Sequence, residues 1–67
     1  METKKATERQ VQIMQMVANN LKQAEIAVVL NISVRSLEGE VKKIRQIWGD
    51  MSLPALCVEF YRNGLIS

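Results

Sequence analysis

The chain has 67 residues, 48% of them hydrophobic, and a formal net charge of +2, which suits one small domain with a single core and argues against a disordered tail. It contains no histidine, a single cysteine (Cys57) and three widely separated glycines, so it lacks the commonest general base, a zinc cluster, an internal disulfide and a phosphate-binding loop. No apolar run approaches the roughly 18 residues of a membrane span, and the charged N-terminus does not fit a secretory signal. We therefore expect a cytoplasmic protein that binds no membrane. From the missing residue types we also expect that it is not an enzyme and needs no cofactor.

The first six residues are polar and include adjacent lysines, Lys4 and Lys5. Chain ends of this kind are often poorly ordered. We therefore expect a flexible arm at residues 1–6, followed by one domain at residues 7–67.

The first helix is expected over about residues 8–19. Thr7 is a favourable N-cap, and Gln10, three residues later, completes a capping-box pattern. The apolar residues after it recur at helical spacing: Val11, Ile13, Met14, Val17 and Ala18. Asn19 and Asn20 tolerate the left-handed backbone conformation at which helices commonly end.

A second helix is expected over about residues 23–30 and a third over about residues 34–48. The apolar side of the second helix comprises Ile26, Ala27 and Leu30. Asn31 can end the second helix, and Ser33 can cap the third. Because only about three residues separate them, the two helices must turn sharply and pack across each other, which defines a helix-turn-helix.

The third helix has the clearest apolar periodicity in the chain. Its apolar stripe, with spacing i, i+4, i+7 and i+11, consists of Leu37, Val41, Ile44 and Trp48. Trp48 is therefore expected in the core rather than as a platform for stacking bases. The opposite face carries Arg35, Glu38, Gly39, Lys42, Arg45 and Gln46. Gly49 then ends the helix.

A fourth helix is expected over about residues 53–63, capped by Ser52 and with Pro54 in its first turn. Its apolar residues exceed what one buried face needs. We expect the surplus to form a homodimer interface, made by Leu56, Val58, Phe60 and Tyr61. In the alternative, the tail residues Leu65 and Ile66 fold back over part of this surface.

Taken in order and at this spacing, the residues resemble the LuxR-type, or GerE-type, helix-turn-helix domain of bacterial transcription regulators, over residues 7–66. The motifs that carry the resemblance are Thr7-x-Arg9-Gln10, Glu25-Ile26-Ala27 with Leu30, Ile32-Ser33-x-x-Ser36-Leu37, Trp48-Gly49 and Asn63-Gly64-Leu65-Ile66. The resemblance implies a compact all-α, four-helix domain whose third helix enters the major groove and whose fourth helix often mediates dimerisation. Carried over by position, the DNA-contacting residues are Ser33, Arg35, Ser36, Glu38, Gly39, Lys42 and Lys43.

The cations around the third helix are interpreted as contacts to phosphates and guanine edges rather than as a merely solvated surface. They are Arg35, Lys42, Lys43 and Arg45, and Lys22 and the Lys4–Lys5 arm add further positive charge.

The acidic residues of the third helix depart from the family, which usually has lysine where this chain has Glu38 and often histidine where it has Glu40. Glu38 either accepts a hydrogen bond from cytosine N4 or pairs with Lys42, and Glu40 is expected in a structural salt bridge. Gly39 either permits close approach to DNA or is an exposed position without a role.

The sequence thus predicts a small stand-alone transcription regulator that binds double-stranded DNA sequence-specifically as a homodimer. A larger transcription regulator or RNA polymerase is a further candidate partner. In the alternative, the chain keeps the helix-turn-helix fold but binds a partner regulator instead of DNA, because Glu38 and Glu40 oppose contact with phosphates.

Overall fold

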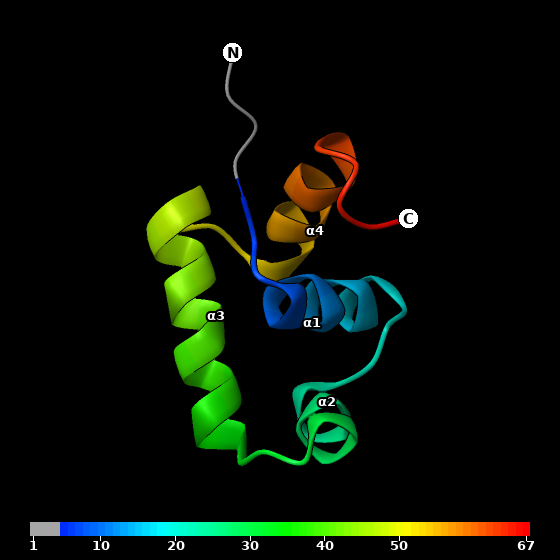
Figure 1. Cartoon of the computed structure of the whole chain (residues 1–67), viewed down its shortest axis with the longest axis vertical. Helices are drawn as coiled ribbons and strands as arrows, with labels where there is room; N and C mark the ends of the chain where they lie inside the picture. The colour runs from blue at the N-terminus through cyan, green and yellow to red at the C-terminus, as the bar shows by residue number, and fades with distance from the viewer. Residues whose placement is uncertain (1–4) are drawn as a thin grey trace.

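The computed structural model describes residues 5–67, which form four helices: α1 (Glu8–Ala18), α2 (Gln23–Leu30), α3 (Val34–Trp48) and α4 (Leu53–Arg62) (Figure 1). The predicted all-α class is confirmed, and only α1 and α4 end one residue before their expected limits. Of the expected arm, Lys4 lies outside the described residues, Lys5 is exposed, and Ala6 already packs against the core.

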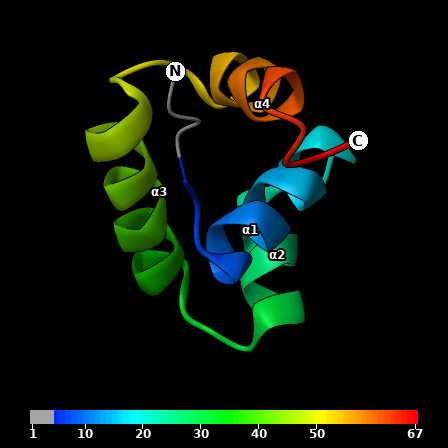
Figure 2. The same cartoon turned by 45° about the horizontal axis from the view of Figure 1, so that its top comes forward.

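Helix α1 lies at the centre of the domain and contacts each of the other three helices, most extensively α4. In both views α3 runs along one side of the molecule, while α4 and α2 lie on either side of α1 (Figures 1 and 2). Within residues 5–67, none of the helices combines the length and the hydropathy that crossing a bilayer requires.

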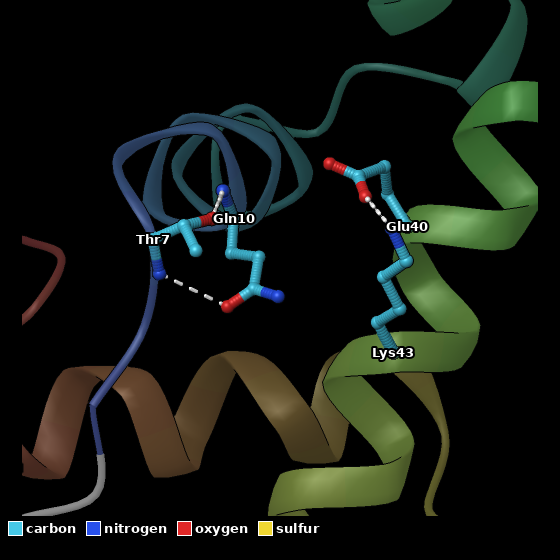
Figure 3. A network of polar contacts seen from close by, with 4 residues as sticks. All are labelled: Thr7, Gln10, Glu40 and Lys43. Carbon is cyan, nitrogen blue, oxygen red and sulfur yellow. Dashed lines mark hydrogen bonds and ion pairs between the residues drawn. The ribbon is translucent and has the colours of Figure 1, made fainter.

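The start of α1 is fixed by the capping box that the sequence predicts. The Gln10 backbone N–H donates to Thr7 Oγ1 at 3.1 Å, and the Thr7 backbone N–H donates to Gln10 Oε1 at 3.0 Å (Figure 3). This return bond turns the Gln10 side chain inward, so the residue is only 4% exposed.

Helices α2 and α3 are joined by a tight turn at residues 31–33. Asn31 adopts the left-handed conformation (φ 56°, ψ 45°), and the Ile32 backbone N–H donates to the Ala27 carbonyl at 3.0 Å. Ser33 then begins α3, because its Oγ accepts a hydrogen bond from the Ser36 backbone N–H at 3.0 Å. The predicted helix-turn-helix connection is confirmed.

The core lies where α1, α3 and α4 meet, with α2 closing one end. Its fully buried large side chains are Ile13, Met14, Ile26, Leu37, Ile44, Leu56 and Phe60. Trp48 is 3% exposed and stacks on Phe60, with 4.4 Å between ring centroids and 28° between ring planes. Trp48 is therefore a core residue, as expected from its place on the apolar stripe.

The expected dimer interface requires a correction. Leu56 and Phe60 are both 0% exposed and belong to the core, so neither can contact a partner without unpacking the domain. Val58 and Tyr61 lie on the other side of α4 and are 52% and 66% exposed. Only these two of the four residues are available to a partner.

The tail folds back onto the body, which was the alternative for the apolar surplus of α4. Ile66 is 8% exposed and joins the core. The Gln15 side-chain amide holds the end of the chain on α1: Oε1 accepts from the Ser67 backbone N–H, and Nε2 donates to the Ser67 carbonyl, each at 3.0 Å.

Candidate nucleic-acid interface

Within the part of the chain that the structure describes, the outer side of α3 is exposed along its whole length. Its buried stripe faces the core, and the strip directly opposite, with the same i, i+4, i+7 and i+11 spacing, is exposed: Arg35, Gly39, Lys42 and Gln46. A helix of 15 residues is about 22 Å long. We call these four residues the outer strip. All four residues are exposed, and α3 itself runs along one side of the molecule (Figures 1 and 2).

An open groove of about 770 Å³ runs beside the outer strip. It is lined by Gln23, Glu38, Gly39, Val41, Lys42, Arg45, Gln46 and Asp50. Gln23 is the first residue of α2, so the groove joins the face of α3 to the start of the preceding helix. Most of the residues that line it are polar or charged, and they carry charges of both signs.

The flank of α3 away from this groove carries an ion pair. Lys43 Nζ lies 3.3 Å from Glu40 Oε1, and the Lys43 side chain is 68% exposed (Figure 3). The prediction of a structural salt bridge for Glu40 is confirmed. Exposed pairs of this kind contribute at most about 1 kcal/mol to stability, so Lys43 can exchange Glu40 for a phosphate at little cost.

Arg45, which was expected to contact DNA, is engaged by the fold. It is half-buried, and its Nε donates to the Met51 carbonyl at 2.9 Å. The bond ties the last turn of α3 to the loop before α4. Arg45 therefore has a structural role, and any contact of its remaining guanidinium N–H groups with DNA stays a prediction.

The predicted site residues at the helix starts lie where the turn places them. Ser33 and Ser36 are exposed at the first turn of α3, where the Ser33 hydroxyl also donates to Ser36 Oγ at 3.0 Å. Lys22 is exposed just before α2, and its backbone N–H donates to Glu25 Oε1 at 2.9 Å. Glu25 thus caps the start of α2.

Glu38 is exposed on the groove side of the outer strip. Among residues 5–67 the ion pairs are Glu40–Lys43 and Glu59–Arg62, so the pairing of Glu38 with Lys42 that the sequence allowed is not formed. Gly39, beside it, has open space around it: apart from its chain neighbours and the backbone of its own helix, a Cβ built there meets no heavy atom within 4 Å. The centre of the outer face therefore combines a free carboxylate, a free ammonium and a bare backbone.

A second, apolar surface lies between α1 and α4. It is hollowed by a pocket of about 460 Å³, lined by Val17, Ala18, Asn20, Pro54, Cys57, Val58, Tyr61, Ile66 and Ser67. Both Val17 and Ala18 belong to the apolar residues that recur at helical spacing in the first helix; Val17 packs against the core, whereas Ala18 is exposed, and both line this pocket. The spacing of apolar residues on α1 and α4 could have suggested a shared surface, but not which edge of each helix forms it.

Cys57 lies at the edge of this apolar surface and is half-buried. Its Sγ donates to the Met14 carbonyl at 3.7 Å, and burial raises the pKa of the thiol. The group is therefore a protonated, weakly polar packing residue at neutral pH.

Comparison with known proteins gives one match. Residues 5–47 fit the family model of bacterial regulatory proteins of the luxR family, also called GerE. The matched part covers α1, α2 and all of α3 except its last residue, and it ends before α4. No curated protein and no solved structure matches the chain.

Proposed function

The chain belongs to the luxR family of bacterial regulatory proteins, whose helix-turn-helix domains typically bind DNA in the regulation of transcription, and we propose that it binds double-stranded DNA with α3 in the major groove. The observation that carries this proposal is the exposed outer strip, which lies opposite a buried apolar stripe on a helix that begins at a tight turn. The major groove, about 12 Å wide, admits one α-helix.

Phosphate contacts in this arrangement come from the cations around α3. Arg35 and Lys42 on the outer strip are exposed and form no ion pair within residues 5–67, so their charge is available to DNA. Lys43 exchanges its bond with Glu40 for a phosphate, and Lys22 at the start of α2 approaches the neighbouring backbone. These contacts supply affinity, while the uncharged outer strip residues and Glu38 face the base edges.

Two copies of the chain would read an inverted repeat. The apolar surface around Val58 and Tyr61 supports self-association, because both side chains are more than half exposed beside an apolar pocket. The contacts Arg45–Met51 and Trp48–Phe60 tie α4 to the end of α3, so pairing through α4 fixes the distance between the two recognition helices. We propose half-sites centred about 34–36 Å apart, one helical turn of DNA.

The test is a fluorescence-anisotropy titration against duplex DNA at about 50 and 200 mM salt. Each neutralised phosphate contributes about −0.9 to the slope of log K against log salt concentration. The double variant Arg35→Gln, Lys42→Gln should therefore weaken binding and reduce the slope by about 2. The matched control is Arg62→Gln, which removes an exposed cation from α4 and should leave the slope unchanged. A salt-independent affinity, or equal effects of the two variants, refutes the proposal.

A second candidate function is favoured by the free carboxylate of Glu38 at the centre of the face. Under this proposal the chain binds a larger regulator or RNA polymerase through the apolar surface of α4 and does not bind DNA itself. Glu38→Gln separates the two candidates. If Glu38 merely repels phosphates, the variant gains DNA binding that the natural protein lacks; if α3 already binds DNA, the natural protein binds and the variant changes its sequence preference.

A further inference from the structure

We propose that Glu38 determines DNA sequence specificity, because its carboxylate accepts a hydrogen bond from the N4 amino group of a cytosine in the major groove. In this proposal Gly39 has no side chain so that α3 can come close enough to the DNA for this bond. The inference rests on the proposed function, because it requires α3 to lie in the groove. It adds the base that is read and the residue that reads it.

The first observation is that, among residues 5–67, no cationic side chain pairs with the Glu38 carboxylate. Lys42 is one helical turn away, at the i, i+4 spacing that favours ion pairs, yet the two do not pair, whereas Glu40 and Lys43 on the other flank do. Glu38 instead lines the open groove beside the outer strip, together with Lys42 and Arg45.

The second observation concerns what a carboxylate can meet in the major groove. A carboxylate is an acceptor only and is repelled by phosphates, so a favourable contact requires a donor on a base edge. The donors there are the amino groups of cytosine and adenine; adenine is best read by the amide of Asn or Gln, and cytosine N4 by Glu or Asp. With Lys42 and Arg45 beside it, Glu38 enters the groove next to cations that offset the phosphate potential.

The third observation is Gly39, for which the fold itself has no requirement. Its φ is not positive, unlike that of Gly49 or Gly64, and a Cβ there would meet no heavy atom within 4 Å beyond its chain neighbours and its own helix backbone. Glycine is nevertheless the poorest helix former apart from proline. Neither the backbone geometry nor the internal packing requires a glycine at this position. We therefore attribute the missing side chain to close contact with a surface outside the chain, which in this proposal is the wall of the DNA major groove next to Glu38.

The first experiment selects bound sequences from randomised duplexes with the natural protein, with Glu38→Ala and with Glu59→Gln. Glu59→Gln is the control, because it removes an acidic charge from α4, away from the face of α3. The natural protein and the control should select the same motif, with cytosine at one position of each half-site. Glu38→Ala should lose the preference at that position only. Selection of the same cytosine by Glu38→Ala overturns the inference.

The second experiment removes the proposed donor from the DNA. N4-methylcytosine at the selected position keeps its pairing with guanine and replaces the N–H that faces the major groove by a methyl group. The natural protein should bind this duplex about tenfold more weakly, while Glu38→Ala should bind both duplexes equally. Equal sensitivity of the two proteins overturns the inference and leaves DNA binding standing. If the natural protein binds no duplex at all, the proposed function fails, and this inference fails with it.

Discussion

Replacing Gly39 by alanine should stabilise the domain while weakening its binding to DNA. The added methyl group has open space within the chain, and the backbone at this position is not in the left-handed region. Alanine is better than glycine inside a helix by about 0.8–1.0 kcal/mol. For a domain of this size that gain corresponds to a rise of about 4–8 °C in melting temperature.

The same methyl group should prevent α3 from coming into close contact with the wall of the DNA major groove. We expect DNA affinity to fall at least about fivefold, or about 1 kcal/mol. Urea denaturation followed by circular dichroism measures the stability, and anisotropy titration with duplex DNA measures the affinity. Gly64→Ala is the matched control: its Cβ would also meet open space, but φ is +71° there, so this variant should lose about 1–2 kcal/mol of stability. A stabilised Gly39→Ala protein with unchanged DNA affinity would refute the argument from close approach, and a destabilised one would refute the argument from open space.

Three further predictions concern the fold. Trp48→Ala removes a buried ring that stacks on Phe60 and should cost about 3–5 kcal/mol, enough to unfold the domain at 25 °C, while Trp48→Phe should remain folded by circular dichroism; a folded alanine variant would contradict this. Thr7→Ala removes the hydroxyl that accepts the Gln10 N–H and should lower the free energy of unfolding by about 1 kcal/mol; a urea midpoint unchanged from the natural protein would show that the cap contributes nothing. Burial raises the pKa of the Cys57 thiol in the folded state, because the folded protein disfavours the thiolate. The free energy of unfolding is therefore not reduced by this group below about pH 8.5, and it falls as the pH rises through the raised pKa. Unfolding at pH 7 and pH 10 should therefore show a larger alkaline loss in the natural protein than in Cys57→Ala, and equal losses would argue against this contribution.

The helices could be predicted because their determinants are local in the chain. Thr7, Ser33 and Ser52 each accept a hydrogen bond from the backbone N–H three residues later, and such caps are visible as residue types at fixed spacing. The apolar period of the third helix fixed its buried side in the same way. Gln10 shows the limit of this reasoning: its capping role was expected, but not that the return bond to Thr7 would bury it.

The salt bridge of Glu40 could be predicted from the sequence but its partner could not, because spacings i+3 and i+4 both bring side chains together. The structure pairs Glu40 with Lys43 and does not form the pair of Glu38 with Lys42 that the sequence allowed. The two acids also differ in burial, which the local spacing does not reveal: the Glu40 side chain is 22% exposed, whereas Glu38 is exposed.

The surface of α4 was misassigned for a different reason. An excess of apolar residues is visible in the sequence, but the rotation of α4 about its own axis depends on how α1, Trp48 and the tail pack against it. Leu56 and Phe60 proved to be core residues, and Val58 and Tyr61 remained exposed. Such a rotation is set by contacts far apart in the chain, which no local pattern encodes.

The double hydrogen bond between the Gln15 amide and Ser67 has a practical consequence for experiments. It anchors the carboxyl end on the side of the molecule opposite α3, as both views show (Figures 1 and 2). A fluorophore or an immobilisation tag joined after Ser67 would therefore leave the outer strip unobstructed. Such a label would sit beside the pocket between α1 and α4, so a change in its emission would test the proposed self-association separately from the proposed contact with a duplex.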